Sequence, residues 1–111
     1  PVWGRNTMDY DLLIYTANWP HKRIHAWDTL LTARAIENMS YCIGVNRIGT
    51  DGSDLQYPGH TAIYDFLGVQ LGGTTKNEPG QITIQLEKSK QQLVRGKLNF
   101  LNDRDHFLIQ S

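Results

Sequence analysis

The sequence has no excess of charge of either sign, only one cysteine and no long apolar run. Its 11 basic residues balance its 11 acidic residues, so we expect no basic surface of the kind that binds nucleic acid or membranes. One cysteine excludes an internal disulfide and any multi-cysteine metal site, which is typical of a reducing compartment. No apolar stretch approaches the ~20 residues of a membrane-spanning helix. We therefore expect a soluble, cytoplasmic chain that forms at most one domain.

The single cysteine, Cys42, is the first candidate for a nucleophile. Its neighbours Tyr41, Ile43 and Val45 belong to a predicted buried strand, and no cationic residue flanks it to lower its pKa. A buried neutral thiol is inert, so we interpret Cys42 as a core residue. The chain also lacks a glycine-rich phosphate loop and a nucleophile elbow, and its residues make up no complete catalytic set.

Two histidines have the spacing of metal ligands. His21 and His25 are four residues apart, as two ligands on one helical face would be, and Asp28 follows closely. Pro20 and the loop composition argue against a helix at this point, and a third ligand is not evident. We therefore predict no metal and no cofactor. His60 follows Pro58-Gly59 at the start of a predicted strand, where a histidine most often makes a backbone contact.

The segment Trp27 to Arg47 predicts a helix that breaks near Met39 and leads into a buried strand, Tyr41 to Asn46. The helix carries one apolar face and a second apolar stripe, so we expect it to be covered on more than one side. The residues are Trp27, Leu30, Leu31 and Ala35 on the face, with Ala33, Ile36 and Met39 in the stripe. Arg34 lies inside this arc and must be paired, because burying a lone charge costs several kcal/mol. Glu37, one turn later, predicts a structural Arg–Glu pair.

The other elements follow from apolar runs and turn residues. Leu12 to Thr16 is a continuous apolar run that fits a strand covered on both faces, parallel to the strand Tyr41 to Asn46. A long surface loop is expected from Arg47 to His60. The further expectations are a strand at 61–64, a turn at 66–68, a hairpin partner at 69–71, a half-exposed strand at 81–86 and a polar helix at 87–95 ended by Gly96. The apolar tail, residues 97–111, must dock on this domain or on a partner.

The sequence Asn18-Trp19-Pro20 lies at the carboxyl end of the first predicted strand. In open α/β sheets this edge is where ligands bind. An amide that can hydrogen-bond and an indole that can cover a ligand are suited to a pocket wall. Equally, Trp19 could plug its loop against the core, and the residues alone leave both interpretations open. The apolar start Pro1-Val2-Trp3, without an initiator methionine, suggests a chain cut from something longer.

Several segments, in order, resemble the carbon–nitrogen hydrolases of the nitrilase superfamily, and in particular their omega-amidase branch. They are Pro1 to Asn6 (PVWGRN), Asp11 to Pro20 (DLLIYTANWP) and Trp27 to Asn46 with its ARAIEN core. Tyr57 to Thr61 with Asp65 to Gly68 is similar to a strand and turn of that family, and Phe100 to Phe107 to its C-terminal tail. His60-Thr61 stands where some members have Asp-Ser or His-Ser, which leaves the substrate open.

The resemblance implies an α/β fold, the C-terminal half of a four-layer α-β-β-α sandwich, with residues 1–111 as a single partial domain. In this family the PVW segment follows directly on the segment that carries the nucleophilic cysteine, a few residues before the position of Pro1, and a glutamate base and a lysine lie further upstream. None of the three is in this chain, and Cys42 does not align with the nucleophile. The resemblance therefore implies a fragment that is inactive by itself.

The parent enzyme that the resemblance implies hydrolyses monoamides of short dicarboxylic acids, such as 2-oxoglutaramate, through a cysteine thiolate. Asn18 and Trp19 match the family loop that faces the nucleophile, which implies a substrate-binding role. Arg5, Arg34 and Glu37 match recurrent positions that we interpret as structural. The family pairs its subunits through the helix of the ARAIEN segment, which implies a homo-oligomer through Trp27 to Met39.

A different class of function fits the same absences. The chain could be a free-standing, non-enzymatic module that binds a protein partner through an exposed sheet and its apolar tail. The two hypotheses differ in the coding sequence before Pro1, which encodes the nucleophile segment in the first and a start codon in the second.

Overall fold

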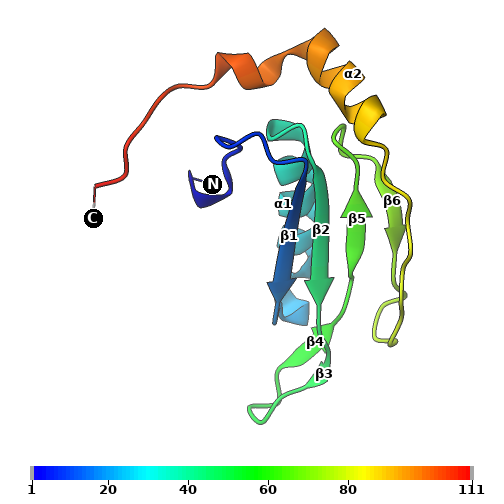
Figure 1. The fold of residues 1–111 in the computed structure, drawn as a ribbon. Coiled ribbons are helices and arrows are strands. Elements are labelled where there is room, and N and C mark those ends of the chain that lie inside the picture. Colours follow the sequence, from blue (N-terminus) through cyan, green and yellow to red (C-terminus); the bar gives the residue numbers. More distant parts are fainter. Residues whose placement is uncertain (1, 111) are drawn as a thin grey trace.

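The computed structural model describes residues 2–110, so Pro1 of the PVW segment and Ser111 of the apolar tail lie outside the described residues. A four-stranded sheet in the order β1-β2-β5-β6 forms one layer, and helix α1 covers one of its faces (Figure 1). The elements are β1 Leu12–Ala17, α1 Ile24–Glu37, β2 Tyr41–Asn46, β3 Ile48–Thr50, β4 Gln56–Pro58, β5 Ala62–Tyr64, β6 Gln70–Gly73 and α2 Lys88–Leu98. Short 3₁₀ helices lie at Val2–Gly4, His21–Arg23 and Phe100–Asp103.

The parallel pairing of β1 with β2 confirms the crossover predicted from the sequence. The register runs from Leu12 opposite Tyr41 to Ala17 opposite Asn46, and α1 makes the connection. Strand β5 pairs antiparallel with β2, and β6 pairs antiparallel with β5. The predicted hairpin is therefore confirmed, and the carboxylate of Asp65 closes its turn by accepting two backbone N–H bonds.

The start of α1 differs from the prediction of a loop from His21 to Ala26. His21–Arg23 form a 3₁₀ turn, and α1 begins at Ile24. Pro20 is extended, and its carbonyl accepts the N–H of Arg23 at 3.0 Å. A proline inside a helix disrupts it, because it cannot donate a backbone hydrogen bond. Before the first turn no helical hydrogen bond needs that N–H, so a proline is tolerated there. Pro20 therefore marks the helix start.

Helix α1 buries one apolar face against the sheet. The core combines three residues of α1 with three of the sheet: Trp27, Leu31, Ala35, Cys42, Ala62 and Tyr64. Two apolar side chains of the same helix, Leu30 and Ile36, remain 43% and 44% exposed. The apolar arc of α1 is thus wider than the part of the helix that the sheet covers.

The opposite face of the sheet is open near β1. Leu12 and Ile14 on β1 are 36% and 56% exposed, and Val45 on β2 is 44% exposed. The prediction that β1 is covered on both faces is therefore wrong within the described residues. The apolar run arises because both faces of the strand carry apolar residues, and α1 covers only one of them.

The expected surface loop from Arg47 to His60 is instead a β-hairpin. Strands β3 and β4 pair antiparallel at the lower end of Figure 1. Asp51 organises the turn, since its carboxylate accepts the N–H groups of Ser53 and Leu55 and the hydroxyl of Tyr57 at 2.6–3.0 Å. A loop prediction based on Gly, Asp and Ser content missed this hairpin because both of its strands are only three residues long.

The prediction of a strand at 81–86 is wrong, although its alternation is real. The segment is irregular and runs beside β6 (Figure 1). Ile82 and Ile84 pack over Gly72, and Gln81, Thr83 and Gln85, which alternate with them, are exposed. Helix α2 is longer than predicted, because Gly96 lies within it and Asn99, in the left-handed region at φ 54°, ends it.

Polar contacts attach α2 to the amino end of β1. Gln91 donates to the carbonyl of Asp11 at 2.8 Å. Arg95 donates to the carboxylate of Asp11 and to the carbonyl of Met39, both at 2.9 Å. The helix is thus held mainly by hydrogen bonds, which agrees with its polar composition.

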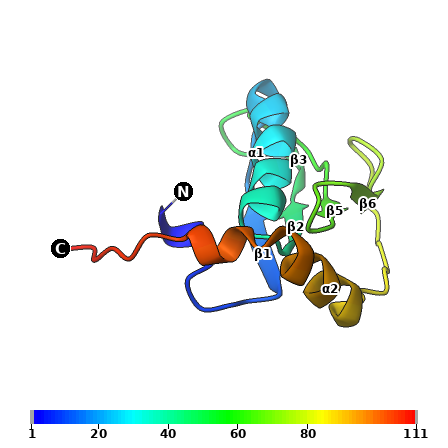
Figure 2. The same ribbon diagram turned by 90° about the horizontal axis from the view of Figure 1, so that it is seen from above.

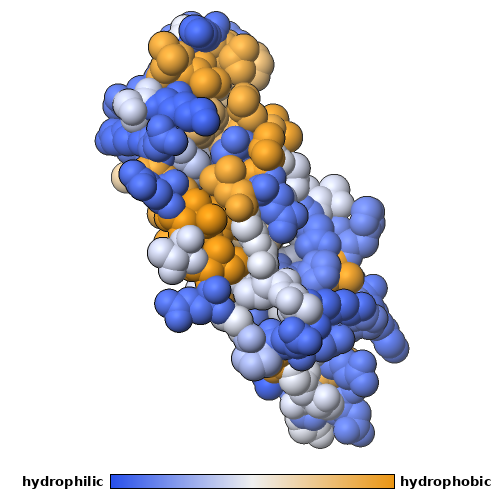
Figure 3. Space-filling model, turned by 90° about the vertical axis from the view of Figure 1, so that its right-hand side faces the viewer, coloured by the Kyte–Doolittle hydropathy of each residue, from blue (hydrophilic) through white to orange (hydrophobic). Residues whose placement is uncertain are grey.

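The apolar tail docks only in part. Arg104 donates to the carbonyl of Asn6 and to Asp9, but Leu108 is 92% exposed and the last described residues extend away from the sheet (Figures 1 and 2). Viewed from the β6 side, most hydrophobic residues gather in the upper half and hydrophilic ones at the lower end (Figure 3). None of the helices within residues 2–110 is long and apolar enough to cross a membrane.

Candidate functional site

The loop Asn18-Trp19-Pro20 follows the carboxyl end of β1, as predicted. The last backbone bond of the β1–β2 ladder runs from the N–H of Arg47 to the carbonyl of Ala17 at 3.2 Å. Beyond it, both backbone polar groups of Trp19 bind the side chain of Asn46. The N–H of Trp19 donates to Asn46 Oδ1 at 2.7 Å, and Asn46 Nδ2 donates to the Trp19 carbonyl at 3.0 Å.

Asn18 presents its carboxamide to solvent. The residue is exposed, and this side chain makes no hydrogen bond within residues 2–110. A carboxamide offers both donors and an acceptor, so Asn18 is free to bind a polar ligand at this edge of the sheet.

The indole of Trp19 is half-buried between a ring and a cation. It packs against Trp27 with ring centroids 5.7 Å apart, and the guanidinium of Arg23 lies 4.9 Å from its centre. Its Nε1 donates to the carbonyl of Arg23 at 2.6 Å. The indole thus both closes its loop against the core and forms part of a cavity wall, so the two interpretations left open by the sequence are compatible.

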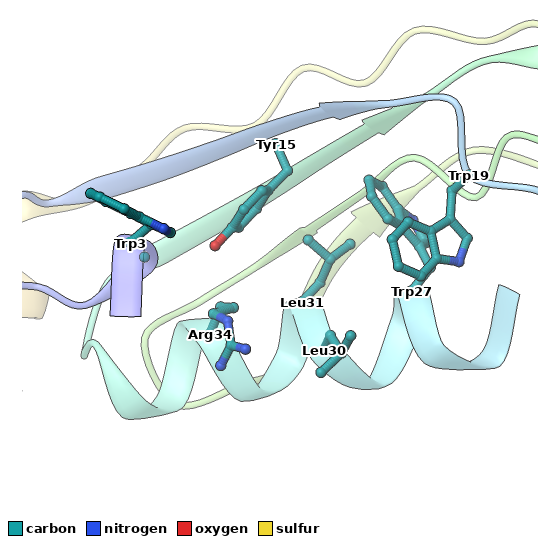
Figure 4. Close-up of a pocket in the computed structure, with 8 residues that line it drawn as sticks. Trp3, Tyr15, Trp19, Trp27, Leu30, Leu31 and Arg34 are labelled. Carbon is teal, nitrogen blue, oxygen red and sulfur yellow. The ribbon is translucent and has the colours of Figure 1, made fainter. Parts of the chain in front are cut away.

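A cavity of about 290 Å³ lies between β1 and α1 (Figure 4). Tyr15 projects from β1 toward the helix, with Trp3 beside it, and Trp19 and Trp27 close the opposite end. Leu30, Leu31 and Arg34 line the helix side. Among the described strands β1 is the edge of its sheet, so the cavity opens beside a strand with an unpaired edge.

The polar end of this cavity is built around Arg34. Its guanidinium forms an ion pair with Glu37, with 15% and 33% of the two side chains exposed. Burial raises the pKa of the Tyr15 hydroxyl above its usual value, and the positive charge of Arg34 opposes that rise. The predicted pairing of Arg34 is thus confirmed as a contact, while its purely structural role stays a prediction. Arg5 is half-buried, and with Val2, Glu37 and Phe107 it lines a separate surface pocket.

The histidines are separated from one another. His21 lies in the 3₁₀ turn and His25 in α1, and both are exposed. The imidazole Nδ1 of His60 lies 3.1 Å from both carboxylate oxygens of Asp28, a side-chain partner in place of the predicted backbone contact, and the His60 carbonyl accepts the indole N–H of Trp27 at 2.9 Å. Across residues 2–110, no three His, Cys, Asp or Glu side chains come close enough to hold a metal ion.

Cys42 lies fully buried in the core beside Leu31 and Ala35. Burial raises the pKa of its thiol to about 11, although the positive charge of Arg34 lowers it somewhat. Less than one thiol in a thousand is therefore ionised near pH 7. Cys42 is unsuited to nucleophilic attack.

Sequence reasoning missed Asn46, which joins three segments at the candidate site. It is 6% exposed, and besides Trp19 it binds the carbonyl of Gly59 and the hydroxyl of Thr61. The only signal in the sequence was an amide at the last position of a predicted buried strand. Asn6 and Asn38, also missed, form a similar buried pair at the other end of α1.

Comparisons with known proteins agree on one family. The carbon–nitrogen hydrolase family model matches residues 5–95. The chain is 41% identical over 109 residues to the omega-amidase YafV of Yersinia enterocolitica, covering 98% of this chain and 43% of that protein. It is 30% identical over 105 residues to the 2-oxoglutaramate amidase of Bacillus subtilis, covering 93% of this chain and 40% of that protein.

The solved structures give the same result. A carbon–nitrogen hydrolase superfamily protein of Xanthomonas campestris, with an arsenic adduct in its active site, matches with a TM-score of 0.94 and 36% identity. The match covers 99% of this chain and 44% of that protein. A carbon–nitrogen hydrolase of Helicobacter pylori, 20% identical with a TM-score of 0.75, shares the fold. The chain thus spans less than half the length of the relatives it matches.

Proposed function

The chain belongs to the carbon–nitrogen hydrolase family, and we propose from this premise that it is the C-terminal part of an omega-amidase-like enzyme. The observation that carries the proposal is its 41% identity, over 98% of its length, to an omega-amidase. Because the chain spans only 43% of that relative, we assign to residues 1–111 a single partial domain. The rest of the enzyme would then complete the fold.

The open surfaces of the chain support this assignment. Leu12, Ile14 and Val45 expose apolar surface on the uncovered face of the sheet, and the thinnest dimension of the molecule is 18 Å. That thickness corresponds to one sheet and one helix layer, since packed layers are about 10 Å apart. A second sheet and helix layer on this face would produce the four-layer α-β-β-α sandwich, of which this chain forms half.

The chemistry would come from outside these residues. In the proposed reaction a cysteine thiolate, deprotonated by a glutamate, attacks the amide carbon, while a lysine and a backbone N–H stabilise the oxyanion. The C–N bond breaks, the nitrogen takes a proton and leaves as ammonia, and water then hydrolyses the thioester to the carboxylic acid. Cys42 is unsuited to the first step because it is buried and its thiol pKa is raised to about 11.

This chain would contribute the substrate-facing loop. We assign to Asn18 and Trp19 the binding of a monoamide of a short dicarboxylic acid, such as 2-oxoglutaramate. The free carboxamide of Asn18 can bond the substrate, and the indole of Trp19, held by Trp27 and Arg23, can cover it. Arg5, Arg34 and Glu37 would act structurally, with the Arg34–Glu37 pair satisfying a mostly buried guanidinium.

The exposed apolar residues of α1 support pairing of two subunits through this helix. Leu30 and Ile36 are 43% and 44% exposed on a helix whose opposite face is buried. A partner helix packed on them would supply the second cover that the wide apolar arc requires. We therefore propose a homo-oligomer joined through residues 27–39.

The proposal is tested by assaying ammonia release from 2-oxoglutaramate. The complete protein that includes this chain should be active, and the 111-residue chain alone should not. Asn18→Ala in the complete protein should lower kcat/KM about tenfold, the value of one lost hydrogen bond. The exposed Thr75→Ala serves as the control. A complete protein that hydrolyses no short dicarboxylic monoamide, or an active 111-residue chain, would contradict the proposal.

A second candidate, a non-enzymatic interaction module, is favoured by the exposed tail residues Phe107, Leu108 and Ile109, which are 48%, 92% and 50% exposed. The discriminating observation is the coding sequence before Pro1. A reading frame that continues upstream into a cysteine-containing segment supports the enzyme, and a start codon directly before Pro1 supports the module.

A further inference from the structure

The side chain of Asn46 replaces a strand backbone where the β1–β2 ladder ends. In a β ladder, each peptide group both donates and accepts. Asn46 does the same for Trp19 with its carboxamide, accepting from the N–H at 2.7 Å and donating to the carbonyl at 3.0 Å. No other side chain among the described residues bonds the backbone of Trp19. Among these side chains, one amide alone therefore fixes the backbone of Trp19.

The same amide holds the turn on the other side of β2. The second hydrogen of Asn46 Nδ2 goes to the carbonyl of Gly59 at 2.8 Å. Gly59 and His60 both have left-handed backbones, at φ 75° and 58°. A non-glycine residue in that region is strained and persists where its surroundings hold it, often at functional sites.

The two loops are also linked through Trp27 of α1. The carbonyl of His60 accepts the indole N–H of Trp27, and Trp27 packs against Trp19. The contacts form a closed loop: Asn46 joins the two backbones, and the Trp27 indole joins the Trp19 ring to the His60 carbonyl. A shift in either loop therefore moves the wall that Trp19 forms.

We propose that Asn46 is the positioning residue of the candidate site: its carboxamide fixes the Trp19 backbone against the Gly59–His60 turn and thereby sets the affinity for the amide substrate. This inference rests on the proposed function, because it takes Asn18 and Trp19 as the substrate-binding residues. It adds a residue that touches no substrate and acts through its neighbours.

Few side chains can replace this carboxamide. Both of its N–H donors and its oxygen are used, at 2.7–3.0 Å, within a site that is 6% exposed. Aspartate has the same shape but has no donor when ionised, so the carbonyls of Trp19 and Gly59 would lose this partner. Alanine removes all three bonds.

The test compares Asn46 with Asn38 in the complete protein. Asn38 is buried as well and also joins two backbone segments, since it accepts from the N–H of Asn6 and donates to the carbonyl of Arg34, both at 2.9 Å. It lies at the opposite end of α1 from the candidate site. The variants Asn46→Ala, Asn46→Asp, Asn38→Ala and Asn38→Asp are assayed for kcat and KM with 2-oxoglutaramate and for thermal midpoint.

Both Asn46 variants should raise KM about tenfold while kcat stays within about threefold, because a displaced binding wall weakens ground state and transition state alike. The Asn38 variants should lower the thermal midpoint comparably and leave KM within about twofold. Should Asn46→Ala fail to fold, Asn46→Asp, which keeps the shape, decides. An unchanged KM in a folded Asn46 variant, or an equal rise in the Asn38 variants, would overturn the proposal.

A second measurement needs no catalysis. The indole N–H resonance of Trp19, identified with Trp19→Phe, should move or broaden in the Asn46 variants and stay in place in the Asn38 variants. If the unaltered protein hydrolyses no monoamide, the proposed function fails, and this resonance still decides whether Asn46 positions Trp19. An unmoved resonance in the Asn46 variants would refute the positioning role whatever the activity.

Discussion

Replacing Gly44 with alanine should destabilise the protein by overpacking the contact between β2 and α1. A Cβ at this position would lie 2.3 Å from Leu31 Cδ1 and 2.6 Å from Trp27 Cζ2. Carbon atoms normally rest about 3.5–4.0 Å apart, so both side chains must move by about 1 Å. Leu31 and Trp27 are 3% and 4% exposed and both belong to the packed core. Overpacking of this kind costs about 1–3 kcal/mol of unfolding free energy.

The matched control for this prediction is Gly52→Ala. Gly52 has nothing within 4 Å of the position of a Cβ, and its φ is not positive. The same substitution there should be neutral or stabilise by less than about 1 kcal/mol, because it only restricts the unfolded chain. Urea unfolding followed by tryptophan fluorescence measures both variants. If Gly44→Ala were as stable as Gly52→Ala, the close approach of helix and strand would be refuted.

Three further outcomes are expected. The pKa of Asp11 is lowered, chiefly by its hydrogen bond from Lys88. The stabilisation of the folded state by the ionised Asp11 carboxylate is therefore present above about pH 4 and is lost as the pH falls below that value. Amide exchange in α2 should therefore accelerate in acid, and much less so in Asp11→Asn; equal acceleration in both would contradict this attachment. Cys42 should react with a disulfide reagent at pH 8 only as fast as the protein unfolds, because the thiol is buried with a raised pKa; rapid labelling of the folded protein would show that it is accessible. The double change Leu30→Glu with Ile36→Glu should dissociate the proposed oligomer in sedimentation experiments on the complete protein, and an unchanged oligomer would place the interface elsewhere.

The family resemblance and the central crossover could be predicted from the sequence. Each of three segments has an apolar pattern long enough to identify the element. They are the strands Leu12 to Thr16 and Tyr41 to Asn46 and the helix that carries Trp27 and Leu31. The predictions failed where short-range chemistry decides the structure. Three-residue strands held together by Asp51 carry too little pattern to be recognised.

The candidate site was predicted in its exposed parts and missed in its buried ones. The position of Asn18 and Trp19 after a strand made them candidates for a ligand-facing loop, and their binding role stays a prediction. Nothing local distinguished Asn46, because its partners lie 27 and 13 residues away along the chain. A residue whose role comes from distant backbone groups is visible only once the chain is folded.

The sequence by itself determined the family, the parallel pairing of β1 with β2 and the burial of Cys42, because these depend on patterns of neighbouring residues. Only the tertiary structure decided that one face of β1 is open, that Gly96 lies inside α2, and that a single amide holds two loops together. These features depend on which atoms meet after folding. The apolar run from Leu12 to Thr16 illustrates the difference: it specifies a strand with two apolar faces, whereas the arrangement of the other elements determines which face is covered.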